Sequence, residues 1–368
     1  MKNQKSWPDR SGETIAIRMA SDVAADTPRL DLPLRIPAHW RPEPLVNVHA
    51  VDIEAPLLAW FCEMGFGARH LEMLRTFAPG QYAGAPFPHA TRRELLCIAK
   101  YLSLWLLWDD EDVESNGRGF NLRPYQIFHA SAKPPTNIFD KAWWNLFCEL
   151  AQVHSRNWIE MLVEAMHMWS VAALAEARQV QSWNSEQRHV RFSDAMQSRI
   201  ATIGMYATAH LLEHARHIEL PRIIHQHPTV RRIKMLANKI VGLGNDLLSL
   251  GKDLARDYVN VIVVLADEYA LSLQEAIRRS TRMHDDALLE FDRLAASLPS
   301  FGPEHDGAIA VWLDDLRYSC LGFVMWEARA PRYAAFKVLV DGAVLEPRFV
   351  FRSHSSSAAV RAMANPVG

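Results

Sequence analysis

Two short segments of the chain carry side chains of the types that bind divalent cations. The first is the run Asp109-Asp110-Glu111-Asp112-Val113-Glu114, which directly follows an apolar segment. On a helix Asp110 and Glu114 share a face, because they are four residues apart. The helix dipole disfavours carboxylates at a helix C-terminus, and hard oxygen ligands beside phosphates suit Mg²⁺. Asp109, Asp110 and Glu114 are therefore candidate metal ligands; the alternative is a solvated acidic helix end.

The second segment places three hard ligands along one helix. Asn245, Ser249 and Asp253 stand at positions i, i+4 and i+8, so an amide, a hydroxyl and a carboxylate form one stripe. Lys252 lies beside the stripe and could contact an anion. Polar stripes are commonly solvated, but this one interrupts a markedly apolar helix. We therefore expect it to face a cavity.

Together the two segments resemble the paired metal-binding motifs of class I terpene synthases, the aspartate-rich motif and the Asn/Ser/Glu triad. Their separation of 136 residues (245 − 109) lies in the range that this family uses. Arg199 stands 46 residues before Asn245 and heads Arg-Ile-Ala-Thr-Ile203-Gly204, which resembles the diphosphate-sensing arginine with its linker and effector positions. Asn260 and the run from Trp326 to Arg332-Tyr333 match further family patterns, so the resemblance covers roughly residues 40–340.

The resemblance implies a fold, a cofactor and a set of roles. The expected fold is an all-α, single-domain class I terpenoid synthase-like helical bundle around a deep apolar pocket. The expected cofactor is Mg²⁺, as a cluster of about three ions, with Mn²⁺ as a substitute. The expected substrate is a prenyl diphosphate; farnesyl diphosphate is preferred on family frequency, with geranyl and geranylgeranyl diphosphate left open. The expected catalytic residues are Asp109, Arg199, Ile203, Gly204 and Trp326; the diphosphate contacts are Arg199, Lys252, Arg332 and Tyr333; the aromatic pocket residues are Trp326, Phe77, Tyr82, Trp105 and Trp169.

One position departs from the family pattern. The third triad residue is usually Glu, and here it is Asp253, which is shorter by one methylene. Asp can still ligate Mg²⁺ if the helix lies closer or a water bridges the gap. Asp257, one turn further along, is the alternative third ligand.

Helical periodicity accounts for most of the chain that must position these residues. Apolar side chains recur three and four apart in the segments 57–66, 92–108, 141–177, 192–213, 230–265, 273–298 and 308–328. Alternation long enough to predict a strand is not apparent. We expect a flexible N-terminal tail over residues 1–38, a catalytic α-domain over residues 39–345 and a C-terminal tail over residues 346–368.

Composition excludes several other classes of protein. The chain has 368 residues, with 40 basic and 42 acidic side chains scattered along it, so a nucleic-acid surface is not expected. The four cysteines form no CxxC pair, which argues against a disulfide framework. No targeting segment or run of about 18 apolar residues is evident, so the prediction is a cytoplasmic protein without a membrane span. A monomer and a homodimer both remain open.

Three alternatives remain beside this interpretation. His210-Leu-Leu-Glu213-His214 fits the H-x-x-E-H pattern of inverted zinc peptidases, although no third protein ligand is identifiable. A chain-elongating prenyltransferase would share the fold, but Asn245 and Ser249 stand where it needs a second aspartate-rich motif. A non-catalytic diphosphate-binding helical protein would tolerate the change at Asp253.

Overall fold

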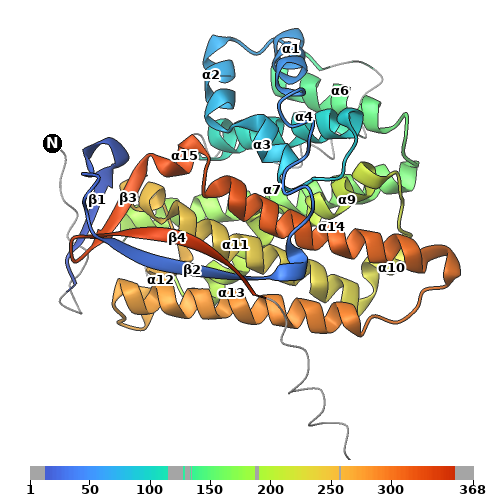
Figure 1. Cartoon of the computed structure of the whole chain (residues 1–368). Helices are drawn as coiled ribbons and strands as arrows, with labels where there is room; N and C mark the ends of the chain where they lie inside the picture. The colour runs from blue at the N-terminus through green and yellow to red at the C-terminus, as the bar shows by residue number, and fades with distance from the viewer. Residues whose placement is uncertain are drawn as a thin grey trace, which may run out of the picture.

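The structure, a computed structural model, describes residues 13–114, 127–128, 133, 135–186, 190–256 and 258–352; of residues 112–114 and 179–186 only the backbone is described. Helices dominate these residues (Figure 1). They are α1 (Glu54–Met64), α2 (Ala68–Thr76), α3 (Pro79–Gly84), α4 (Arg92–Trp108), α6 (Ile138–Leu150), α7 (Arg156–Glu186), α8 (Phe192–Thr202), α9 (Met205–Arg216), α10 (Arg222–Gln226), α11 (Pro228–Arg256), α12 (Val261–Glu268), α13 (Leu273–Ala296), α14 (Pro303–Glu327) and α15 (Pro331–Ala334).

Short polar side chains start several of these helices. The Asn137 side chain accepts hydrogen bonds from the backbone N–H groups of Phe139 and Asp140 at the start of α6. Ser272 caps α13 through the N–H of Glu275. These caps satisfy N–H groups that have no partner within the helix. After Trp108, α4 continues as a π-helical turn, η3 (Asp109–Glu114), so the acidic run stays attached to a rigid helix.

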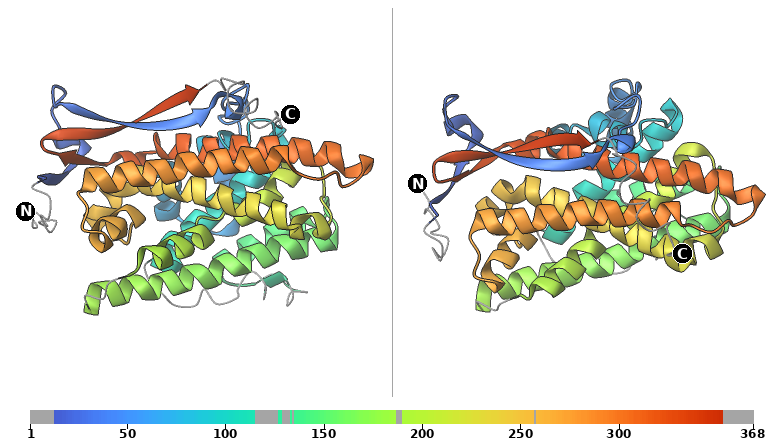
Figure 2. Two further views of the ribbon diagram at one scale, coloured as in Figure 1. Left: turned by 90° about the horizontal axis from the view of Figure 1, so that it is seen from below. Right: turned by 60° about the horizontal axis from the view of Figure 1, so that its bottom comes forward.

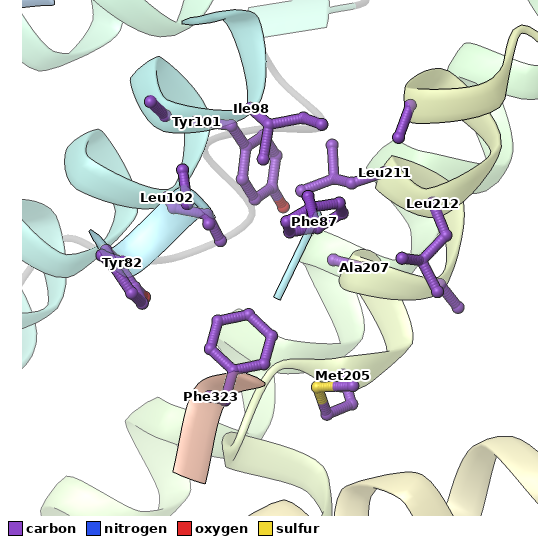
Figure 3. Packing of buried hydrophobic residues seen from close by; sticks show 14 of the residues in the cluster. Tyr82, Phe87, Ile98, Tyr101, Leu102, Met205, Ala207, Leu211, Leu212 and Phe323 are labelled. Atoms are coloured by element: carbon purple, nitrogen blue, oxygen red, sulfur yellow. The ribbon is translucent and has the colours of Figure 1, made fainter. Parts of the chain in front are cut away.

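Large apolar side chains fill the space between the helices. Side chains from α4, α9 and α14 meet there, among them Tyr101, Leu211 and Phe323 (Figure 3). Trp108, Trp143, Trp158 and Trp312 are almost completely buried in the same core. Among the described residues, no helix is both long and apolar enough to cross a lipid bilayer.

A small four-stranded sheet covers one side of the helical body, and the sequence analysis did not expect it. Its strands are β1 (Ile15–Met19), β2 (Arg29–Pro37), β3 (Phe336–Val340) and β4 (Ala343–Arg352), in the order β1-β3-β4-β2. Both β1 and β4 lie antiparallel to β3, whereas β2 lies parallel to β4. Figure 2 shows the sheet along the side of α13, with α7 on the opposite side of the body.

The sheet corrects the predicted tails. Residues 13–38 contain β1 and β2, and β4 crosses the predicted boundary at residue 345, so neither segment is a simple tail; residues 1–12 and 353–368 lie outside the described part. The alternation Leu30, Leu32, Leu34, Ile36 was the missed signal. Pro33 and Pro37 obscured it, but β2 is an edge strand, where proline is tolerated.

Candidate active site

One cavity of about 240 Å³ gathers most of the residues that the motifs single out. Twelve of them line it: Tyr82, Trp105, Asp109, Trp169, Arg199, Ile203, Asn245, Lys252, Asp253, Trp326, Arg332 and Tyr333. Four others, Phe77, Asp110, Gly204 and Ser249, lie in the second layer behind this lining. The side chain of Glu114 and the whole of Asp257 lie outside the described residues.

The acidic run places its two aspartates in different surroundings. Asp109 lines the cavity. Asp110 instead receives a bidentate pair from Arg332, with Nη–Oδ distances of 2.8 and 2.9 Å. Glu111 lies 3.2 Å from His70 Nε2 and 3.6 Å from Arg69. Protein cations therefore compensate part of the negative charge at this helix end, and Asp109 is the aspartate of the pair that faces the cavity.

The polar stripe of α11 is closely tied to the start of α12. The Ser249 hydroxyl donates to Asp253 Oδ2 at 2.5 Å, and Asn260 Nδ2 donates to the same oxygen at 2.9 Å. Asn260 also caps α12 through the N–H of Ile262. Asp253 Oδ1 lies 3.5 Å from Lys252 Nζ. The shorter side chain of Asp253 is thus held in place by its neighbours.

Arg199 joins the end of α8 to this stripe. Its Nε lies 2.7 Å from Asp246 Oδ1, and an Nη donates to Asn245 Oδ1. Asp246 Oδ2 accepts from the N–H of Val261 at 2.8 Å. Burial raises the pKa of Asp246, while the Arg199 charge acts to lower it. Asp246 is therefore a structural anchor for Arg199, a role that the sequence analysis did not assign.

The break between α8 and α9 depends on glycine. Gly204 has φ +91°, and a Cβ there would lie 1.5 Å from Trp105 Cη2. Trp169 Nε1 donates to the carbonyl oxygen of Thr202 at 2.6 Å and so holds the last turn of α8. As a result Ile203 lies against the cavity.

Aromatic rings form another wall of the cavity. Tyr82 and Trp326 stack with centroids 4.0 Å apart, and Tyr333 meets Trp326 edge-on at 5.5 Å. The Trp326 indole donates to the carbonyl oxygen of Phe77 at 2.6 Å, which fixes the ring plane. The Phe77 ring itself lies 5.2 Å below the Arg332 guanidinium, so it supports that arginine and is not among the residues that line the cavity.

Comparison with known proteins identifies the family. The family model described as terpene synthase family 2, C-terminal metal binding, matches residues 100–290, which is more than half of the chain. The chain belongs to this terpene synthase family. It is therefore an enzyme of the terpene synthase class, a lyase, and the family's metal-binding domain implies a divalent metal cofactor.

Microbial relatives and solved structures agree with this assignment. The chain is 26% identical over 306 residues to the (+)-T-muurolol synthase of Roseiflexus castenholzii, covering 78% of this chain and 90% of that protein. It is 25% identical over 308 residues to the 10-epi-cubebol synthase of Sorangium cellulosum, covering 79% and 96%. The solved α-eudesmol synthase superposes with a TM-score of 0.65 at 21% identity, covering 81% and 98%, which confirms the helical terpenoid synthase fold.

The donor set of the terpene synthase fits a hard divalent cation. Asp109, Asn245 and Asp253 bring carboxylate and amide oxygens to one cavity, and Ser249 lies one turn from two of them. Sulfur and imidazole ligands are absent from this described set. Oxygen-only sites favour Mg²⁺ or Mn²⁺ over zinc.

The zinc-peptidase pattern folds into a different arrangement. His214 does not join Glu213; its Nδ1 lies 2.9 Å from His154 Nε2. The second histidine beside Glu213 is instead His225, and His210, Glu213 and His225 offer ligand atoms within 4.8 Å of one another. However, Lys234 Nζ lies 3.4 Å from His225 Nδ1. An imidazole that accepts there from an ammonium carries its proton on Nε2, which then has no lone pair for a metal. We therefore interpret this group as a structural network.

Glu327 is a cavity residue that the sequence analysis missed. It directly follows Trp326, lines the cavity and is 3% exposed. Burial raises the pKa of its carboxyl to about 8. A carboxylate within the otherwise apolar last turn of α14 was the available signal, but helical periodicity alone does not tell which neighbour it meets.

Proposed function

We propose that this terpene synthase is a Mg²⁺-dependent sesquiterpene cyclase, which ionises farnesyl diphosphate and cyclises the resulting carbocation with release of diphosphate. One observation carries the proposal: Asp109 and the α11 residues Asn245 and Asp253 line the same cavity as a wall of stacked aromatic rings. A polar end for a diphosphate and an apolar end for a hydrocarbon are what this reaction needs. The choice of farnesyl diphosphate is supported by the names of two relatives, which describe (2E,6E)-farnesyl diphosphate cyclising enzymes.

The polar end would hold the diphosphate and its metal. Asp109, Asn245, Ser249 and Asp253 are the proposed metal ligands, with Asp110 and Glu114 as further members of the motif. When bound, Mg²⁺ acts as a Lewis acid that stabilises negative charge on the departing group. Arg199, Lys252, Arg332 and Tyr333 are proposed to donate hydrogen bonds to the diphosphate oxygens.

The apolar end would hold the cation. A carbocation cannot form hydrogen bonds, so aromatic faces such as those of Trp326, Tyr82 and Trp105 stabilise it. The enclosed walls also keep away water that would otherwise quench it. Ile203 and Gly204, beside Arg199, are proposed to act when the diphosphate is recognised, through the carbonyl group at the α8–α9 break.

The test is incubation of the purified chain with geranyl, farnesyl and geranylgeranyl diphosphate, followed by gas chromatography with mass detection. We expect cyclic products from farnesyl diphosphate with Mg²⁺, and none after chelation with EDTA. Asp109→Ala should lower turnover by about a hundredfold or more with an unchanged circular dichroism spectrum. Turnover that survives EDTA, or that only Zn²⁺ restores, would refute the metal assignment. Conversion of geranylgeranyl diphosphate alone would refute the substrate length.

A further inference from the structure

The side chain of Asn245 is held from one side by a carboxylate of a different helix. Asn245 Nδ2 donates to Glu327 Oε1 at 2.8 Å, and Tyr333 Oη lies 3.4 Å from the same nitrogen. Asn245 and Glu327 are 8% and 3% exposed. Water therefore offers little competition for this hydrogen bond, which is strengthened by the low polarity of its surroundings.

The two residues meet because α11 and α14 approach closely just before them. A Cβ on Gly244 would lie 2.7 Å from Val324 Cγ2, so only glycine allows the observed spacing. Val324 is one turn before Glu327 on α14, and Gly244 directly precedes Asn245 on α11. The packing of Gly244 against Val324 thus sets the distance between the two helices, and this distance lets Asn245 and Glu327 form their hydrogen bond.

The contact decides which way the Asn245 amide points. The amide has an NH₂ group that donates and an oxygen that accepts. With NH₂ toward Glu327, the oxygen faces the opposite side, where an Nη of Arg199 donates to it. A rotation by 180° would bring the amide oxygen against the Glu327 carboxylate and the NH₂ against the guanidinium. Both observed hydrogen bonds would be lost, since an acceptor would face an acceptor and a donor would face a donor, so the two neighbours select one orientation.

We propose that Glu327 is a positioning residue of the metal site: it holds the NH₂ group of Asn245 and so keeps the amide oxygen, which accepts from Arg199, on the side away from Glu327 as the metal ligand. The inference rests on the proposed function, in which Asn245 is a metal ligand. Partners of this kind orient a ligand, and their loss typically lowers metal affinity by about 10- to 100-fold. Glu327 acts here through its acceptor oxygen, with no need for the negative charge to reach the metal.

The test compares Glu327→Leu with Glu327→Gln, with the Mg²⁺ concentration for half-maximal turnover of farnesyl diphosphate as the readout. Leu cannot accept the hydrogen bond, so we expect this concentration to rise by about tenfold or more. Gln keeps an acceptor oxygen, so its rise should stay within about threefold. Asp314→Gln, which changes an exposed carboxylate of the same helix, is the matched control. Thermal unfolding monitors the fold of each variant.

A second pair of variants exchanges donor and acceptor. Asn245→Asp removes the NH₂ group that donates to Glu327 and leaves two carboxyl groups facing each other, so the Mg²⁺ requirement should rise. Adding Glu327→Gln to that variant supplies an NH₂ group opposite the new carboxylate, so the double variant should recover much of the lost Mg²⁺ affinity. This recovery also tests the inference if Glu327→Leu fails to fold.

The outcomes separate the two proposals. If the wild-type enzyme showed no Mg²⁺-dependent turnover, the proposed function itself would be refuted. With normal wild-type turnover, an unchanged Mg²⁺ requirement in Glu327→Leu would overturn only the role of Glu327. Equal losses in the Leu and Gln variants would overturn it too, because they would show that the carboxylate charge is what matters.

Discussion

Two buried polar clusters of similar composition lie in the helical body, and they face different surroundings. The metal-side cluster, defined as Arg199, Asn245, Asp246 and Asp253, lines the cavity. The histidine cluster, defined as His210, Glu213, His225 and Lys234, lies between α9, α10 and α11, outside the described lining of that cavity. Both combine acidic groups with nitrogen donors, and both bring together side chains from more than one helix.

In the histidine cluster, both carboxylate oxygens of Glu213 contact other groups of the protein. Glu213 Oε1 lies 3.2 Å from His210 Nδ1 and 2.8 Å from His225 Nε2, while Glu213 Oε2 accepts from the N–H of Leu220 at 2.8 Å. Burial acts to raise the pKa of Glu213, but its contacts with the two imidazoles lower it to about 2. The comparison shows that residue types alone do not define a site: a buried polar cluster can bind a ligand only where it opens onto space.

The largest expected effect comes from the metal-side cluster. Asp253→Ala removes a proposed metal ligand together with the acceptor of Ser249 and Asn260, so turnover should fall about a thousandfold, equivalent to ~4 kcal/mol in the barrier. Steady-state kinetics measure the loss, and Asp286→Ala, an exposed aspartate of α13, is the control. Asp253→Glu should also lower turnover, by about tenfold, because the longer side chain must displace a closely held carboxylate. Full activity of Asp253→Ala at low Mg²⁺ would remove Asp253 from the site and move attention to Asp257.

In the histidine cluster, we expect a substitution to lower the stability of the protein and to leave turnover nearly unchanged. Glu213→Gln removes a carboxylate oxygen that both imidazoles contact and the buried negative charge beside Lys234, so the free energy of unfolding should fall by about 3 kcal/mol. The turnover of the folded fraction should remain within about twofold of the wild type. Urea denaturation and active-site-normalised kinetics measure the two quantities. If Glu213→Gln lost turnover at unchanged stability, the histidine cluster would have a role in turnover, and the contrast between the two clusters would be wrong.

Acid should destabilise the protein through His210. Burial lowers the pKa of this imidazole to about 4, below the value of 6.5 that it has without burial. Between pH 6.5 and about pH 4, His210 binds a proton in the unfolded chain but not in the folded chain. The free energy of unfolding therefore falls as the pH falls. From pH 7 to pH 5 the loss is about 2 kcal/mol. His210→Gln should flatten this part of the pH profile of unfolding, and His305→Gln, on the N-terminal turn of α14, should not. Equal slopes in all three proteins would contradict the prediction.

The smallest expected effect lies in the aromatic wall. Trp326→Leu removes a ring that stacks on Tyr82, and cation–π stabilisation of about 1 kcal/mol biases branch points between products by about fivefold. We expect altered hydrocarbon ratios with a smaller change in total turnover. Trp326→Phe, which keeps a ring, should shift the ratios less. Identical ratios in both variants would assign Trp326 to packing alone.

Much of the site follows from local sequence. The spacing of Asn245, Ser249 and Asp253 determines that they share a helix face, and the apolar run before Asp109 determines that the acidic segment ends a helix. The same periodicity predicts the helical body, because a helix face is a property of residues three and four apart. The family resemblance, carried by these motifs, then supplied the fold that the comparisons confirm.

Tertiary structure alone decided the rest, because it depends on residues that are distant in the chain. Arg332 pairs with Asp110 across 222 positions and leaves Asp109 at the cavity; Glu327 meets Asn245 across 82. The strand β1 pairs with β3 from the other end of the chain, so its partner is absent from its own neighbourhood. Local periodicity gives the face of a helix, but the rotation and approach of neighbouring helices are set by packing, here by Gly204 against Trp105 and Gly244 against Val324.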